Sequence, residues 1–166
     1  MSRRCIISDP FRFAAEGRRQ AGVVPVAELS RLVDMLAGSE GVVSFVLAGE
    51  VDGEGSPTLS LIADGVLQLR CQRCLSAMDW PVKLESELHL VRPGTPIPED
   101  ELENDEFDTI EAGADLDVLA LLEEELLLAV PIAPRHESCD APRPLGEVKK
   151  ESPFAALAGL GSKSRT

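Results

Sequence analysis

The chain has 166 residues, about the length of one typical domain, and hydrophobic residues make up 44% of it. Aromatic residues make up only 4%, so Leu, Val, Ile and Ala must build the core. The longest apolar run, residues 126–133, is far shorter than the roughly 20 residues of a membrane-spanning helix, and no signal-peptide core follows Arg3 and Arg4. We therefore expect a cytoplasmic protein whose four cysteines are reduced or bound to a metal.

The net charge of −13 is concentrated in one segment. Residues 93–134 contain no Lys or Arg and 13 acidic residues, whereas acids and bases balance in the rest of the chain. A neutral body with one acidic segment repels a polyanion at long range, although local basic patches can still contact phosphate. Composition alone therefore does not suggest nucleic-acid binding.

The first third of the chain predicts little regular structure apart from one helix. Residues 10–20 predict a loop with a short helix. Residues 26–36 predict a firmer helix, which Pro25 can open and Gly38 can end. Its apolar residues fall at helical spacing: Val26, Leu29, Leu32, Val33 and Leu36.

Three strands follow, at residues 42–51, 58–71 and 78–91, and the third alternates apolar and polar residues most regularly. Asp64-Gly65 is a typical hairpin dipeptide, but a turn there would mix the apolar and polar faces. We expect one long strand with a bulge at Gly65 instead, and a tight turn at residues 52–57.

Residues 93–106 predict a mobile acidic loop. Asp115 then caps a strong predicted helix, residues 116–130, which Pro131 ends. Together these elements predict a single α+β domain, residues 1–139, with a small antiparallel sheet at residues 42–91 that is open or closed into a barrel. The two helices cover this sheet, and residues 140–166 form a flexible tail with a short apolar segment at 153–160.

Two pairs of metal-ligating residues stand at chelating spacing. Cys71 and Cys74 lie in a turn between predicted strands, and His136 and Cys139 lie in the loop after the strong helix. Together they offer a Cys₃His set that fits zinc, provided the fold brings the pairs together. The alternative is reduced, unligated cysteines and a solvated His-Cys pair, and Cys5 is a substitute ligand or a small buried residue.

Two charged groups suggest partners. Arg70, Arg73 and Lys83 form a basic cluster near Trp80 that could bind RNA, although Trp80 itself falls on the apolar side of its strand. The run Glu123, Glu124 and Glu125 predicts a solvated helix face, or a docking surface for a basic partner. An enzyme is not expected, because there is no phosphate-binding glycine loop, His89 has no nucleophile beside it, and the carboxylates cluster in the acidic loop.

Residues 67–75, which contain Cys71-Gln72-Arg73-Cys74, resemble the C-x-R-C segment of the YceD family, the large ribosomal RNA subunit accumulation proteins. Further stretches fit in the same order: the acidic loop leading into Asp115, residues 129–136 followed by Cys139, and residues 152–157. The resemblance implies a small bacterial cytoplasmic protein, not an enzyme, that is needed for synthesis, processing or stability of 23S ribosomal RNA.

Three hypotheses follow. The first is an assembly factor that contacts precursor RNA directly through Arg70, Arg73 and Lys83. The second is an acidic adaptor that holds a basic ribosomal protein or RNA-processing enzyme without touching RNA. The third is a thiol-redox protein centred on Cys71 and Cys74, which the flanking strands disfavour because reactive C-x-x-C motifs usually begin a helix.

Overall fold

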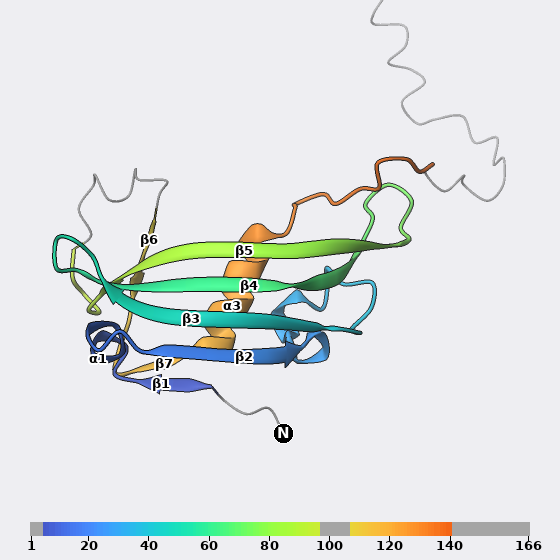
Figure 1. Cartoon of the computed structure of the whole chain (residues 1–166). Helices are drawn as coiled ribbons and strands as arrows, with labels where there is room; N and C mark the ends of the chain where they lie inside the picture. The colour runs from blue at the N-terminus through green and yellow to red at the C-terminus, as the bar shows by residue number, and fades with distance from the viewer. Residues whose placement is uncertain (1–4, 97–106, 141–166) are drawn as a thin grey trace, which may run out of the picture.

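The computed structural model describes residues 5–96 and 107–140. The greater part of the predicted acidic loop and the tail from residue 141 lie outside the described residues. The main sheet has five strands in the order β2-β3-β4-β5-β6, and β1 and β7 form a separate pair (Figure 1). The strands are β1 (Ile6–Ser8), β2 (Arg19–Pro25), β3 (Val42–Val51), β4 (Pro57–Arg70), β5 (Ala77–Val91), β6 (Asp108–Glu111) and β7 (Asp115–Asp117).

The α+β fold class is confirmed, and the described sheet is open, with β2 and β6 at its edges. It is also mixed rather than purely antiparallel, because β6 pairs in parallel with β5. The helical elements are α1 (Pro10–Ala15), the 3₁₀ helices η1 (Val26–Glu28) and η2 (Ser30–Leu32), and α3 (Val118–Ala129). No helix among the described residues is long and apolar enough to cross a membrane.

The three long strands are confirmed to within one residue of the predicted boundaries. The predicted bulge at Gly65 is wrong, since Gly65 pairs in an unbroken register with Val43 on one side and Val82 on the other. Glycine is needed there for close approach instead. A Cβ atom at Gly65 would lie 2.7 Å from the carbonyl oxygen of Val42.

The hydrophobic core lies on one face of the sheet. In β3, β4 and β5 the side chains alternate, and the apolar set of each strand points toward α1, α3 and the 3₁₀ helices. Its fully buried sheet members are Val43, Leu47, Leu59, Leu61, Leu67, Leu69, Val82 and Leu88. Trp80 packs against this core, as its strand position predicts, and α3 lies across the same face (Figure 1).

The predicted helix at residues 26–36 is wrong, because the segment forms η1 and η2. Val26, Leu29 and Leu32 are all buried, and they recur every three residues, which is the period of a 3₁₀ helix. Val33, which a continuous α-helical stripe would have buried, is 60% exposed. The segment therefore covers the core as predicted, but through two short turns.

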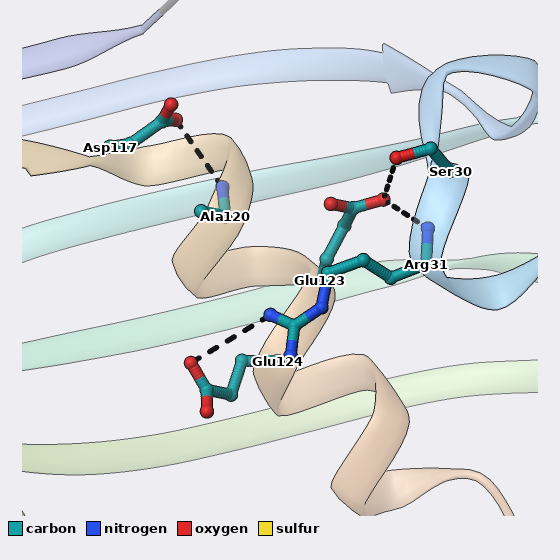
Figure 2. Close-up of polar contacts among 6 residues, drawn as sticks. All are labelled: Ser30, Arg31, Asp117, Ala120, Glu123 and Glu124. Carbon is teal, nitrogen blue, oxygen red and sulfur yellow. Dashed lines mark hydrogen bonds and ion pairs between the residues drawn. The ribbon is translucent and has the colours of Figure 1, made fainter.

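The strong helix begins two residues later than predicted. Asp117, not Asp115, is its N-cap, and the Asp117 carboxylate accepts hydrogen bonds from the backbone N–H groups of Leu119 and Ala120. Figure 2 shows the contact with Ala120. Asp115 instead pairs with Ser8 in the β1–β7 ladder. Residues 116 and 117, which the sequence assigns to the first helical turn, are therefore in a strand instead.

The expectation of a solvated Glu123–Glu125 face is wrong for two of its three residues. Glu123 and Glu125 are each only 5% exposed. The Glu123 carboxylate accepts hydrogen bonds from the Arg31 backbone N–H and the Ser30 hydroxyl (Figure 2), and Glu125 accepts one from Ser86. Only Glu124 faces solvent, 3.9 Å from the Arg31 guanidinium, so the carboxylates chiefly join α3 to η2 and β5.

The N-terminal segment contains two strands that the sequence did not reveal, the short β1 and the longer β2. The short helix expected within residues 10–20 is present as α1, but Arg19 and Gln20 begin the edge strand β2. This strand contains Gly22 and ends at Pro25, residue types that are depleted in strands and weaken the pattern. An edge position tolerates a proline because the missing N–H faces away from the ladder.

Candidate metal centre

The turn between β4 and β5 holds the first pair of candidate ligands. The ladder ends at Arg70 and Ala77, and the backbone N–H of Cys71 donates to Ser76 across the base of the turn. The Leu75 N–H donates back to the Cys71 carbonyl, with Leu75 in the left-handed region at φ 64°. This closed turn fixes the backbone at both Cys71 and Cys74.

The second pair arrives from the end of α3. Val130 is the C-cap of that helix, and the chain then runs back along the β4–β5 turn. The Gln72 N–H donates to the Pro134 carbonyl at 2.8 Å, and Pro134 is buried. That backbone contact fixes the position of residues 134–139 against the turn, so that His136 and Cys139 lie beside the two cysteines.

The structure brings all four predicted ligands together. The ligand atoms of Cys71, Cys74, His136 and Cys139 lie within 4.8 Å of one another. The Cys71 and Cys139 sulfurs are 3.7 Å apart, and the Cys74 sulfur lies 3.3 Å from Nδ1 of His136. None of the described cysteines forms a disulfide. The donor atoms therefore form one Cys₃His cluster that can hold a metal ion.

His136 is oriented by its second ring nitrogen. Nε2 lies 3.2 Å from the carbonyl oxygen of Ala77, which can only accept a hydrogen bond. This contact places the proton on Nε2 in the neutral ring and leaves the lone pair of Nδ1 facing Cys74. Metal-bound histidines commonly have such an outer hydrogen bond to a backbone carbonyl.

Arg73 ties the two halves of the cluster together. Its Nε donates to the Cys139 sulfur at 3.1 Å, and Nη2 donates to the His136 carbonyl at 2.9 Å. Its backbone N–H points at the Cys71 sulfur at 3.4 Å. The sequence placed Arg73 in a basic RNA-binding cluster, whereas the structure gives its guanidinium to the Cys₃His cluster.

The turn also favours thiolates. The pKa of Cys71 is lowered to about 5, chiefly because the backbone N–H of Cys74 hydrogen-bonds its sulfur. The N–H of Ser76 lowers the pKa of Cys74 in the same way. Burial raises the pKa of Cys139, and the Arg73 guanidinium opposes that effect. Thiolate is the form that binds metal ions, so the turn prepares two of the ligands.

The other predicted site residues do not join this cluster. Arg70 is exposed at the end of β4, but Lys83 pairs with Asp64, six ladder positions away, or about 20 Å along the strand. Arg70, Arg73 and Lys83 therefore do not form one patch. Cys5 lies beside Gln20, whose side-chain amide donates to the Cys5 sulfur, and is not among the residues of the Cys₃His cluster.

Comparison with known proteins matches most of the chain to one family. The family model described as "Large ribosomal RNA subunit accumulation protein YceD" matches residues 59–161, which include all four residues of the Cys₃His cluster. A protein of that name from Haemophilus influenzae is 26% identical over 174 residues, covering 93% of this chain and 94% of its own length. No solved structure gives a significant match.

Proposed function

This chain belongs to the YceD family, and from that membership we propose that it is a non-enzymatic factor needed for the synthesis, processing or stability of 23S ribosomal RNA. The family description names an accumulation protein and no reaction. The observation that carries the proposal is the match over residues 59–161, since it includes β5, β6, most of β4, α3 and the Cys₃His cluster together.

We further propose that the Cys₃His cluster binds zinc. Bonds of about 2.3 Å to sulfur and about 2.0 Å to nitrogen put tetrahedral ligands about 3.8 Å apart for two sulfurs and about 3.5 Å for sulfur and nitrogen. The distances of 3.7 Å between Cys71 and Cys139 and 3.3 Å between Cys74 and His136 support that geometry. Three thiolates and an imidazole are also the donor types that zinc prefers.

Bound zinc would supply structural cross-linking rather than catalysis. Four protein ligands complete a tetrahedral site and leave no position for a substrate or a water molecule. Cys71 and Cys74 would hold the metal from the sheet, and His136 and Cys139 from the segment after α3. Arg73 would offset the negative charge that three thiolates leave around a divalent ion.

A second candidate function is the acidic adaptor, which holds a basic protein of the ribosome or of RNA processing without touching RNA. The net charge of −13 favours it, because the field of the chain attracts cationic proteins and repels RNA. Direct RNA contact would depend on exposed basic side chains outside the Cys₃His cluster, such as that of Arg70. Arg73 is unsuitable for testing it, since its substitution would also disturb the cluster.

The test of the proposed function is the level of 23S ribosomal RNA in cells lacking the gene for this chain. We expect mature 23S ribosomal RNA to fall relative to 16S ribosomal RNA, and the wild-type gene to restore it. A gene carrying Cys5→Ser should restore it as well, because Cys5 lies outside the Cys₃His cluster. Unchanged 23S ribosomal RNA in the deletion strain would contradict the proposal.

Direct RNA contact and the adaptor role are separated by titrating RNA at two salt concentrations. Direct contact predicts an affinity that falls steeply with salt and that Arg70→Gln weakens. The adaptor role predicts no measurable RNA affinity at either concentration, in wild type and variant alike.

A further inference from the structure

The sheet has one face that no described element covers. α1, α3 and the 3₁₀ helices all pack on the core face, and Figure 1 shows the opposite side of β2–β5 free of helices. An uncovered face of an antiparallel sheet is normally polar. Here it exposes four large aliphatic side chains, with exposed fractions of 62% for Val23, 53% for Val42, 45% for Ile62 and 48% for Val66. We call the side of β2–β5 that carries these residues the open face.

The strand register arranges the apolar residues of the open face in two rows. The first row crosses four strands in the order Pro25, Val42, Val66 and Pro81. Pro25 pairs with Val42, and Val66 pairs with Pro81. Val42 and Val66 are adjacent because the next pair along these strands is Val43 with Gly65. The second row contains Ala21, Val46 and Ile62, which pair in sequence across three strands. Both rows cross several strands, and the row between them carries Ser44, Asp64 and Lys83 beside Val23. The open face therefore holds two apolar rows separated by polar side chains.

Carboxylates lie along the β5 side of these rows, whereas Arg19 pairs with Ala48 at the β2 side. Glu85 pairs with Ile62, Glu87 with Ser60, and Asp79 with Gln68. A hollow of about 230 Å³ lies on the open face, with Ile62, Asp64, Lys83 and Glu85 among its lining residues. Two carboxylates and one ammonium group leave that hollow acidic, so it suits a Lys or Arg side chain of an incoming chain.

The same features argue against nucleic acid and membranes as occupants. Single-stranded RNA binds sheet faces by stacking its bases on aromatic side chains. The Phe and Trp residues of β2–β5, Phe45 and Trp80, both point toward the core, and the ring of His89 in β5 is already stacked on Phe107 with ring centroids 3.7 Å apart. The carboxylates along β5 would repel RNA phosphates and anionic lipid headgroups alike.

We propose that the open face binds a positively charged, amphipathic segment of a partner protein. The apolar side chains of that segment pack on the rows around Val66 and Ile62, and its Lys or Arg side chains reach Asp64 and Glu85. The proposal goes beyond the RNA accumulation role and does not depend on it, since it is read from β2–β5 alone. It also stands apart from the metal, because the ligands of the Cys₃His cluster lie beyond the end of the β4–β5 ladder.

The experiment measures binding of two labelled synthetic peptides to the full chain by fluorescence anisotropy. One is an amphipathic Lys/Leu peptide, and the other has Glu at every Lys position, so the two share length and apolar spacing. We expect the Lys/Leu peptide to bind at least tenfold more tightly than the Glu/Leu peptide. The double variant Ile62→Thr/Val66→Thr should weaken its binding by about tenfold, because two aliphatic contacts are lost.

Threonine is chosen because it keeps the β-branched shape and the strand propensity of the residues it replaces. The matched control is Val33→Thr, since Val33 is 60% exposed but lies after η2 and outside the sheet. It should bind the peptide as wild type does, and Glu85→Gln should weaken binding while lowering its salt dependence. Circular dichroism and zinc content check that each variant is folded.

Four outcomes would overturn the proposal. Equal binding of the two peptides, or binding that the double variant leaves unchanged, would show that the open face does not select a cationic segment. Displacement of the bound peptide by an unstructured RNA oligonucleotide would make RNA the occupant. If the free chain sediments as a dimer and the double variant Ile62→Thr/Val66→Thr sediments as a monomer, the occupant of the open face is a second copy of the chain. None of these outcomes bears on 23S ribosomal RNA levels, so the two proposals can fail separately.

Discussion

The two turns at opposite ends of β4 are stabilised in different ways. The β3–β4 turn is closed by its own residues: the Asp52 carboxylate accepts hydrogen bonds from the N–H groups of Glu54 and Ser56, each at 2.8 Å. The β4–β5 turn is completed by residues far away in the chain, such as Cys139, 68 positions after Cys71. The first turn can therefore form as soon as β3 and β4 pair.

The β4–β5 turn has local backbone hydrogen bonds as well, but its Cys₃His cluster is complete only after α3 has packed, because His136 and Cys139 follow that helix. It also has an unfavourable backbone conformation, since a leucine occupies the left-handed region at Leu75 where the β3–β4 turn has Gly55. A turn with such costs persists when its surroundings fix it. The difference indicates that the Cys₃His cluster, and not turn propensity, determines the structure at this end of the molecule.

The largest expected effect comes from removing a metal ligand from the β4–β5 turn. Cys74→Ser should abolish zinc binding and lower the free energy of unfolding by roughly 3 kcal/mol or more, because metal-binding energy contributes directly to folding. Cys5→Ser is the matched control and should keep both properties, since Cys5 lies outside the cluster. Urea unfolding and zinc analysis measure the two quantities. Equal stability of the two variants would contradict the cross-linking role.

Arg73 gives the next largest effect. Arg73→Gln should lower zinc affinity about 10-fold to 100-fold, as loss of an outer-shell partner typically does. Arg70→Gln is the control, because Arg70 is exposed three residues earlier and does not contact the ligands. Competition with a chelating dye measures both affinities. If the two variants retain equal affinity, Arg73 does not support the site.

The backbone conformations of the turns predict effects of opposite sign. Leu75→Gly should stabilise the protein and Gly55→Ala should destabilise it, each by about 1 kcal/mol or less, since both positions have positive φ. Leu75 is largely exposed, so little packing is lost with its side chain. Urea unfolding of both variants measures the shifts. Destabilisation by Leu75→Gly would mean that the side chain stabilises the turn through contacts.

The smallest expected effect is a pH dependence of the β3–β4 turn. The N–H groups of Ser56 and Glu54 lower the pKa of Asp52 below its ordinary value of 3.8. Because the pKa is lower in the folded state, the stabilisation is complete above the ordinary pKa and is lost as the pH falls through the lowered value. Asp52→Asn keeps an accepting oxygen without the charge. The stability advantage of wild type over this variant should therefore shrink between pH 6 and pH 3.

The sequence predicted those parts of the fold that depend on local patterns. The alternation in β5 and the cluster of Gly and Pro after β3 fixed the strands and the tight turn, because both signals lie within the element they describe. The bulge at Gly65 was wrong because the role of that residue depends on a neighbouring strand. The 26–36 helix was wrong because a three-residue repeat resembles helical spacing over so short a segment.

At the candidate site, the ligand types and their spacing could be predicted, but the supporting residues could not. Cys71, Cys74, His136 and Cys139 were identified from two short motifs. The guanidinium contacts of Arg73 and the buried carboxylates of Glu123 and Glu125 depend on distant segments. A charged residue has the same sequence signal whether it faces solvent or pairs inside the fold, so composition placed these residues on the surface.

The most direct test of the account is the zinc stoichiometry of the purified full-length chain, measured together with its reactive thiols. We predict one zinc ion per chain, with Cys71, Cys74 and Cys139 becoming reactive only after a chelator removes the metal, and with the reactivity of Cys5 unchanged by the chelator. A chain that binds no zinc when purified and offered the metal, and whose four thiols react freely in the folded state, would contradict it.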